Sequence, residues 1–189
     1  NAPIKGYDIF HIEGYLVQNH DLIRKAVHIA KYEGLKVSLD LASYNVVEEN
    51  LEFLQTLVRD YVDILFANEE EALAFTGKEP EAALDIISKM VEYAIVKVGK
   101  KGSLIKYKGN VVSEGITDNK RVDTTGAGDI FGGSAVWKLL QLGKAPETLT
   151  EAELTDVVRF ACTSAGLSTT RSGGISSVPA YEEILERLV

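Results

Sequence analysis

The sequence predicts an α/β fold, a three-layer sandwich built on a mostly parallel sheet with some antiparallel strands. Short apolar runs alternate with longer amphipathic stretches along the chain, which is typical of strands joined by crossover helices. The composition is 46% hydrophobic and 25% charged, which is globular and excludes a disordered chain. A chain of 189 residues can bury roughly 70% of the surface exposed on unfolding, so it forms a core without disulfide bonds.

Three strands alternate with two helices in the first part of the chain. We expect strands over residues 7–12, 36–41 and 62–66, and helices over residues 21–32 and 48–58. Apolar residues at helical spacing predict one buried face on each helix. These residues are Leu22, Ala26, Ile29 and Ala30 on the first helix, and Leu51, Leu54 and Leu57 or Val58 on the second.

The second part of the chain continues with two short helices and three strands. We expect a helix over 68–75 that stops at Gly77, and a helix over 80–90 with Pro80 in its first turn, where the missing amide costs nothing. Strands follow over 93–98, 103–107 and 110–113, with a hairpin turn at Lys108-Gly109-Asn110. After the polar stretch 114–123, helices over 126–142, 150–167 and 180–188 complete the set.

Charge and cysteine content exclude several classes of protein. The net charge is −8, and no basic run has the density that tracks a phosphodiester backbone, so we expect no nucleic-acid partner. One cysteine, Cys162, excludes a disulfide framework and a thiolate zinc site. The three histidines are scattered along the sequence, which argues against a histidine metal site; they are His11, His20 and His28.

The sequence also predicts a soluble, cytoplasmic protein. No apolar run reaches the ~18 residues needed to cross a bilayer, and residues 1–5 lack the basic and apolar regions of a secretory signal. The only methionine is Met90, so Asn1 is not a translation start. We therefore expect processing, proteolysis or trimming of a longer chain.

The segment from Val122 to Phe131 carries the most chemical information. Gly126 and Gly128 would let backbone amides approach an anion where a helix begins, and the helix dipole favours negative charge at the same place. A carboxylate in that first turn, Asp129, would repel a phosphate unless it had a purpose, such as accepting a proton from an attacking hydroxyl. The alternatives are a simple turn with a dipole partner, or a loose dinucleotide fingerprint ending at Gly132, which the polar residues 117–121 disfavour.

The run Asp123-Thr124-Thr125-Gly126-Ala127-Gly128-Asp129 resembles the C-terminal signature of the ribokinase-like (PfkB) sugar and nucleoside kinases. The resemblance implies a ribokinase-like fold and ATP-dependent phosphorylation of a primary alcohol. It further implies that Gly126, Ala127 and Gly128 form the anion hole and that Asp129 is the catalytic base. Thr124 and Thr125 would contact the nucleotide, and the Asp123 region would hold a monovalent cation such as K⁺.

Three other segments match the family in the same order. Asn68-Glu69-Glu70-Glu71 resembles its Asn-x-x-Glu motif, which implies that Asn68 and Glu71 organise Mg²⁺ through water; alone, it would be ordinary compensation of a helix dipole. Lys97-Val98-Gly99-Lys100-Lys101-Gly102 resembles the nucleotide loop and could equally be a hairpin turn. The resemblance thus implies that Lys97, Gly99 and Gly102 contact ATP. The stretch 164–174 resembles a flank of the nucleotide and cation sites.

The N-terminal part is similar to the middle region of the family, with features of its adenosine-kinase-like branch. Glu13 and Asp40 each lie where a predicted strand ends, and a substrate role for them stands beside a purely structural reading as a strand followed by a turn. Family members are longer, so we expect residues 1–189 to be the nucleotide-binding and catalytic part, with the N-terminal substrate and lid part absent. Without a lid that excludes water, transfer to a sugar should be poor.

The acceptor is a small sugar or nucleoside by this resemblance, and ketohexose phosphate, ribose, fructose and adenosine remain open. We expect no membrane partner, and a homodimer is compatible with the family. Two alternatives from other classes are a catalytically incomplete nucleotide-binding fragment or sensor, and an NAD-dependent oxidoreductase. Phosphoryl transfer from ATP separates the first from a kinase, and nicotinamide binding would indicate the second.

Overall fold

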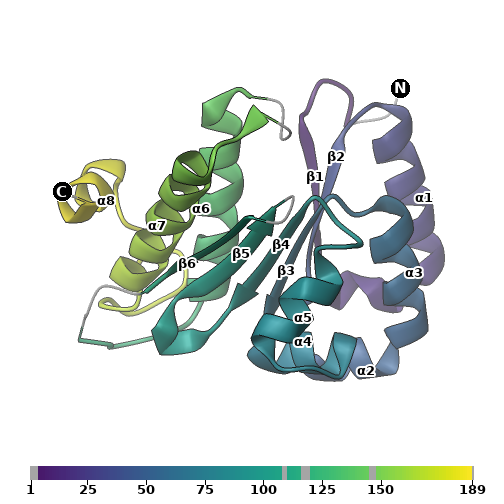
Figure 1. The fold of residues 1–189 in the computed structure, drawn as a ribbon, viewed down its shortest axis with the longest axis horizontal. Helices are drawn as coiled ribbons and strands as arrows, with labels where there is room; N and C mark the ends of the chain where they lie inside the picture. Colours follow the sequence, from purple (N-terminus) through teal and green to yellow (C-terminus); the bar gives the residue numbers. More distant parts are fainter. Residues whose placement is uncertain (1–3, 108–109, 116–119, 145–147, 189) are drawn as a thin grey trace. The chain divides into compact units, whose positions relative to one another are not determined.

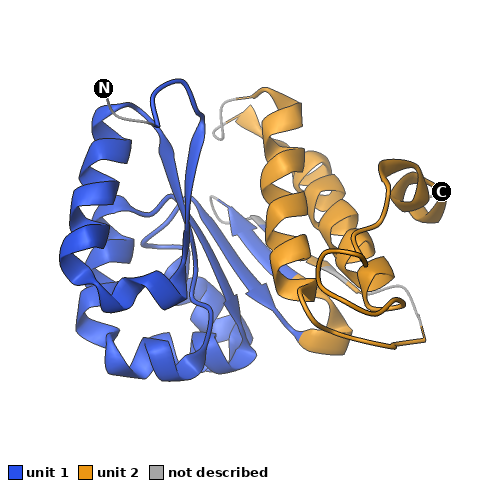
Figure 2. Cartoon of the chain, turned by 180° about the vertical axis from the view of Figure 1, so that it is seen from behind, with its two compact units in different colours: residues 1–98, 104–111 blue, residues 99–103, 112–189 orange. Residues whose placement is uncertain are grey.

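The protein is described here from a computed structural model, which covers residues 4–107, 110–115, 120–144 and 148–188. Two compact units are present: unit 1 contains residues 1–98 and 104–111, and unit 2 contains residues 99–103 and 112–189 (Figure 2). Lys108 and Gly109 of the predicted hairpin turn lie outside the described residues. None of the described helices combines the length and the hydropathy that a membrane span requires.

A six-stranded sheet runs through the fold in the order β1-β2-β3-β4-β5-β6 (Figure 1). Its strands are β1 Ile9–Glu13, β2 Lys36–Asp40, β3 Ile64–Asn68, β4 Tyr93–Lys97, β5 Ser103–Tyr107 and β6 Asn110–Glu114. Strands β1 to β4 pair in parallel in chain order. The sheet is mixed and mostly parallel, so the predicted α/β class is confirmed.

The helices of unit 1 lie together on one side of strands β1 to β4 (Figures 1 and 2). They are α1 His20–Tyr32, α2 Tyr44–Glu49, α3 Leu51–Tyr61, α4 Glu69–Thr76 and α5 Pro80–Ile87, with a short 3-10 turn at Gly14–Gln18. A second 3-10 turn, Gly99–Lys101, belongs to unit 2. Right-handed crossovers that step in one direction along a sheet place their helices on one face. Alternate strand residues such as Val37, Leu39, Leu65 and Val96 accordingly belong to one buried core.

The predicted buried face of α1 is confirmed at Ala30 and wrong at Leu22 and Ile29, which are 53% and 43% exposed. Ile23 and Val27 are buried in their place. Both sets of residues recur at helical spacing, and adjacent stripes of similar apolarity give the same periodicity. Which of the two stripes is buried depends on the side of α1 that faces the sheet.

The predicted helix over 48–58 is two helices. The chain leaves the helical conformation at Asn50, where φ is −125°, and α2 begins earlier because the Ser43 side chain accepts a hydrogen bond from the amide of Val46. The buried positions on α3 follow the prediction at Leu54, Leu57 and Val58. The helix that starts at Pro80 ends at Ile87 rather than at residue 90, and Gly77 ends α4 in the left-handed conformation as expected.

Unit 2 is built from three helices, α6 Ala127–Leu142, α7 Glu151–Ser168 and α8 Tyr181–Leu188. Helices α6 and α7 pack through small residues, and the hydroxyl of Ser134 donates to that of Ser164 at 2.9 Å. Phe160 stacks on Trp137, and both contact Tyr181 on α8. This packing fixes the N-terminal end of α6, which carries the glycine-rich motif.

Candidate active site

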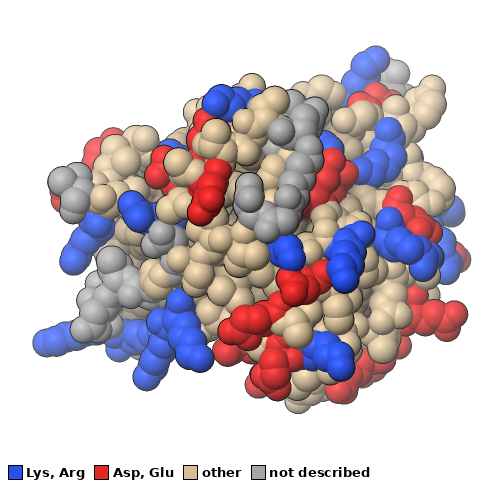
Figure 3. All heavy atoms as spheres, in the orientation of Figure 1, with Lys and Arg blue, Asp and Glu red and all other residues tan. Residues whose placement is uncertain are grey.

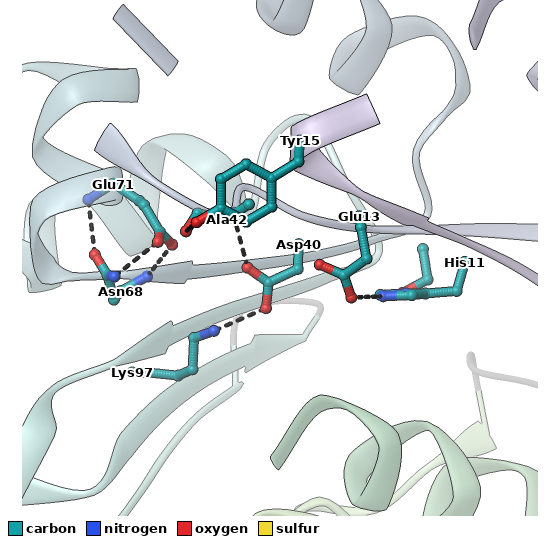
Figure 4. Close-up of polar contacts among 9 residues, drawn as sticks. His11, Glu13, Tyr15, Asp40, Ala42, Asn68, Glu71 and Lys97 are labelled. Atoms are coloured by element: carbon teal, nitrogen blue, oxygen red, sulfur yellow. Dashed lines mark hydrogen bonds and ion pairs between the residues drawn. The ribbon is translucent and has the colours of Figure 1, made fainter. Parts of the chain in front are cut away.

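Each of the four parallel strands of unit 1 ends in a polar side chain. The last residues of β1 to β4 are Glu13, Asp40, Asn68 and Lys97 (Figure 4). Because the strands are parallel, these ends meet at one edge of the sheet, the edge where open α/β sheets bind ligands. Side chains alternate between the faces of a strand, so these residues point away from the face that carries Val37 and Leu39 and packs against the helices.

Lys97 and Asp40 form an ion pair across β3. The Nζ of Lys97 lies 2.7 Å from Oδ2 of Asp40, and the two side chains are only 19% and 11% exposed. The second carboxylate oxygen, Oδ1, accepts a hydrogen bond from the amide of Ala42 at 3.1 Å. Both oxygens of Asp40 therefore have a partner, and Lys97 is held over the centre of the edge.

The turn after β2 is held in a conformation that costs energy. Ala42 has a φ of 66°, the left-handed region that residues with a Cβ seldom adopt. Gly14, which follows β1, lies close to the same turn. A Cβ at this position would lie only 2.6 Å from the carbonyl oxygen of Leu41, so only glycine fits there. The hydroxyl of Tyr15 also reaches the carbonyl of Ala42, at 3.5 Å. These contacts fix the backbone that carries Asp40.

Asn68 and Glu71 interlock at the start of α4. The Asn68 side chain accepts from the amide of Glu71 at 2.8 Å, and the Glu71 carboxylate accepts from the amide and the side chain of Asn68, each at 2.7 Å (Figure 4). Glu71 is 2% exposed. Burial raises its pKa, while the hydrogen bond from the Asn68 amide and the charge of Lys97 act in the opposite direction. This capping box places a buried carboxylate at the ligand edge.

The glycine-rich motif of unit 2 opens α6 with a left-handed residue, Gly126, at a φ of 74°. A Cβ at this position would lie 3.1 Å from the Cα of Gly174, so a residue larger than glycine would displace the facing backbone. The amide of Ala127 donates to the carbonyl of Thr124 at 3.2 Å. Within the described residues, the amides of Gly126, Gly128 and Asp129 have no acceptor. The motif is therefore a cradle with open donors.

Asp129 lies in the first turn of α6 and is exposed. Its carboxylate forms no hydrogen bond or ion pair with any residue that the structure describes. The helix dipole favours an anion at this position. A free carboxylate beside open amides can both accept a proton and leave the amides available for an anion.

Asp123 ties the motif to the segment that follows α7. Its Oδ1 accepts from the amide of Thr125 and its Oδ2 from the amide of Gly173, both at 2.9 Å. These bonds, that of Gly173 first, lower the pKa of Asp123 to about 2. Its carboxylate is thus charged at any physiological pH. Thr124 and Thr125 are exposed beside it.

The loop after β4 is a single tight turn. Gly99 and Gly102 both have positive φ, 53° and 92°, and the amide of Gly102 donates to the carbonyl of Gly99 at 3.2 Å. The two glycines are therefore required by the backbone whether or not a ligand binds. Lys97 belongs to unit 1, and Gly99 and Gly102 belong to unit 2.

No cluster of three or more His, Cys, Asp or Glu side chains suited to a metal ion occurs among the described residues. A divalent ion at this edge would therefore be held mainly by phosphate oxygens and water, which is the usual mode for Mg²⁺ in phosphoryl-transfer sites. Asn68 and Glu71 lie at the ligand edge. Each of their side-chain oxygens accepts one hydrogen bond within the capping box, and the second lone pair of each can accept from a water of the ion. The donor set is compatible with the group that the sequence predicts.

Three features of the site escaped the sequence analysis. They are the ion pair between Asp40 and Lys97, the hydrogen-bonded chain Ser38–His11–Glu13, and the approach of Gly174 to Gly126. The polar last residue of each strand was the available signal for the first two. The third joins segments about fifty residues apart, and no local pattern indicates it.

Solved structures similar to this chain are sugar and nucleoside kinases with the same fold. A fructokinase from Vibrio cholerae O395, bound to fructose, ADP and calcium, has a TM-score of 0.83 at 25% identity. The match covers 96% of this chain and 61% of the fructokinase chain. An adenosine kinase from Sinorhizobium meliloti has a TM-score of 0.79 at 25% identity and covers 96% of this chain and 54% of its own.

The sequence comparisons agree with the structural ones. The ribokinase of Haemophilus influenzae is 32% identical over 174 residues, which is 88% of this chain and 51% of that protein. The model of the pfkB family of carbohydrate kinases matches residues 1–181. The chain belongs to the pfkB family, as its motifs predicted. It spans about half the length of the curated relatives it matches.

Proposed function

We propose that the protein transfers the γ-phosphoryl group of ATP to a hydroxymethyl group of a sugar or nucleoside. The observation that carries this proposal is the open cradle of unit 2, in which the amides of Gly126, Gly128 and Asp129 have no acceptor among the described residues and lie beside the Asp129 carboxylate, which has no partner there either. Family membership supports it independently. Relatives named ribokinase, fructokinase and adenosine kinase support a sugar or nucleoside as the acceptor.

In the proposed reaction, the Asp129 carboxylate accepts the proton of the acceptor hydroxyl. The hydroxyl oxygen then bonds to the γ-phosphorus while the bond from that phosphorus to the bridging oxygen breaks, and ADP leaves with the electron pair. The amides of Gly126, Gly128 and Asp129 would bind the charge that develops on the transferred group. The amide of Ala127, which the sequence also assigned to the anion hole, already donates to the carbonyl of Thr124. Donors that are already oriented at a helix start stabilise this charge without reorganisation.

We assign the nucleotide side of the site to Lys97, Gly99, Gly102, Thr124 and Thr125. Lys97 supplies a positive charge near Glu71. Gly99 has no side chain, so a ligand can approach the backbone of the tight turn there. Asn68 and Glu71 would hold Mg²⁺ through water. When bound, the ion neutralises charge on the phosphate oxygens. An E. coli protein provisionally assigned as ribokinase II has been solved with ATP and Mg²⁺, at a TM-score of 0.79 and 26% identity.

A monovalent cation such as K⁺ is proposed at Asp123. This carboxylate is permanently charged at physiological pH, and each of its oxygens can accept more than the one amide hydrogen bond that it already receives. A double-mutant fructokinase from V. cholerae has been solved with a potassium ion, fructose and ADP. A cytoplasmic location and a homodimer stay predictions.

On the acceptor side, we propose that Glu13 accepts a hydrogen bond from a hydroxyl of the sugar or nucleoside. Glu13 ends β1 at the ligand edge and keeps 44% of its side chain exposed. A carboxylate is a strong acceptor for the hydroxyl groups of a polyol. Asp40 suits this role less well, because its carboxylate is paired with Lys97 and its side chain is only 11% exposed.

A second candidate function is a nucleotide-binding fragment or sensor without transferase activity. The cradle alone would support it, because a helix start with open amides can bind the phosphates of a nucleotide whether or not transfer follows. Incubation of the complete natural protein with ATP, Mg²⁺ and a panel of ribose, fructose and adenosine tests both. Transfer to one acceptor supports the kinase; ATP binding with no transfer to any of them supports the sensor.

A further inference from the structure

Three side chains on the face opposite the helices form one hydrogen-bonded chain. The Nδ1 of His11 lies 3.0 Å from Oγ of Ser38, and the Nε2 of the same ring lies 3.1 Å from Oε1 of Glu13. Figure 4 shows the ring of His11 directed at the Glu13 carboxylate. His11 and Ser38 are register partners on β1 and β2, and Glu13 follows His11 by two residues. The pleat of the sheet therefore places all three on one face.

The order serine, histidine, carboxylate is that of a hydrolase triad, but the burial excludes this use. Ser38 is 0% exposed and lies in the middle of a strand between two neighbours, so no substrate can reach its hydroxyl. At the other end the Glu13 side chain is 44% exposed, and the His11 ring between the two is 39% exposed. Ser38 is thus the anchor, and Glu13 is the group that is presented.

The direction of the hydrogen bonds follows from the chemistry of the three groups. An ionised carboxylate only accepts, so Nε2 of His11 carries a hydrogen and donates to Glu13. In the neutral ring Nδ1 is then an acceptor, and the hydroxyl of Ser38 donates to it. With both ring nitrogens engaged, the imidazole cannot rotate without breaking two bonds. Oε1 of Glu13 is thereby held, and Oε2 accepts from no described residue.

We infer that His11 is a positioning residue for the acceptor substrate: anchored by Ser38, it orients Glu13 so that Oε2 faces a hydroxyl of the sugar or nucleoside. The inference rests on the proposed function. It adds a role for two residues that would not touch the substrate. Orientation matters because a free glutamate loses rotamer entropy when it binds, whereas a held one has already lost it.

The test compares His11→Leu with His11→Gln in the complete natural protein. Leucine removes the donor to Glu13, so we expect the KM for the acceptor to rise about tenfold, with kcat and the KM for ATP changed less than about twofold. Glutamine offers an N–H donor and should restore most of the acceptor KM. Ser38→Ala should give an intermediate rise, since the ring remains but loses its anchor.

Three outcomes would overturn the inference. They are an unchanged acceptor KM in His11→Leu, an equal rise in the KM for ATP, and a His11→Gln variant as impaired as His11→Leu. Nitrogen-15 NMR of the His11 ring in the wild-type protein above pH 8 is a second measurement that needs no variant. A hydrogen on Nε2 supports the chain, and a hydrogen on Nδ1 contradicts it. Absence of transfer by the wild type would instead refute the proposed function.

Discussion

The strongest structural prediction concerns Gly126→Ala in the cradle of unit 2. Alanine at a φ of 74° costs about 1–2 kcal/mol relative to glycine. Its Cβ would also lie 3.1 Å from the Cα of Gly174, and such overpacking adds about 1–3 kcal/mol. We therefore expect the free energy of unfolding to fall by about 2–5 kcal/mol. The affinity for ATP should fall at least tenfold, because the displaced backbone carries the open amides.

Gly143→Ala is the matched control at the other end of α6. Gly143 has a φ of 57°, but a Cβ there meets no atom of the described residues within 4 Å. It should therefore cost only about 1–2 kcal/mol and leave ATP affinity unchanged. Denaturant unfolding gives the stabilities, and isothermal titration calorimetry gives the affinities. Equal effects of the two variants on both quantities would refute the reasoning.

Three further predictions follow from individual contacts. Lys97→Met leaves the Asp40 carboxylate unpaired and should lower the free energy of unfolding by about 2–3 kcal/mol. The loss should be smaller than for a fully buried pair, because both groups are partly exposed. The double variant with Asp40→Asn should recover most of this stability, and no recovery would contradict the pairing. Hydrogen bonds hold the pKa of Asp123 at about 2, below the ~3.9 of an unfolded aspartate. The stability that the Asp123 carboxylate contributes is therefore complete above about pH 4 and is lost as the pH falls through 2. The free energy of unfolding of Asp123→Asn should depend less on pH in that window than that of the wild type, and an identical pH dependence would contradict the role of these hydrogen bonds. Glu71→Gln should lower the apparent affinity for Mg²⁺ in the transfer reaction by about tenfold or more, and an unchanged Mg²⁺ dependence would exclude the proposed role.

Local patterns predicted the order of strands and helices because each signal lies within a few residues. Proline predicts where α5 starts, and Gly77 predicts where α4 ends. The alternation of apolar runs predicts which segments are strands and which are helices. The buried side of α1 and the break at Asn50 were not predictable in the same way. The first depends on where the sheet lies, and the second on a cap provided by Ser43 before an otherwise continuous periodic pattern.

In the candidate site, too, features with a local sequence signal were predicted, and contacts between distant residues were not. The motif from Asp123 to Asp129 was identified from the sequence because glycine spacing and a helix start are local features. The partner of Lys97 was not, since Asp40 lies 57 residues away and meets it only through the parallel register. The same holds for His11 and Ser38, which are 27 residues apart. Contacts of this kind follow from the order and the register of the strands within the sheet, and the sequence analysis predicts neither.

The central claim is that Asp129 removes a proton from the acceptor while the cradle binds the phosphoryl group. Comparison of Asp129→Asn with the wild-type protein, with kcat for transfer and Kd for ATP measured on the same samples, tests it most directly. We expect kcat to fall by about 10²- to 10⁴-fold with Kd changed less than twofold, because asparagine keeps the shape but cannot accept the proton. A variant that retains the wild-type kcat would contradict the claim.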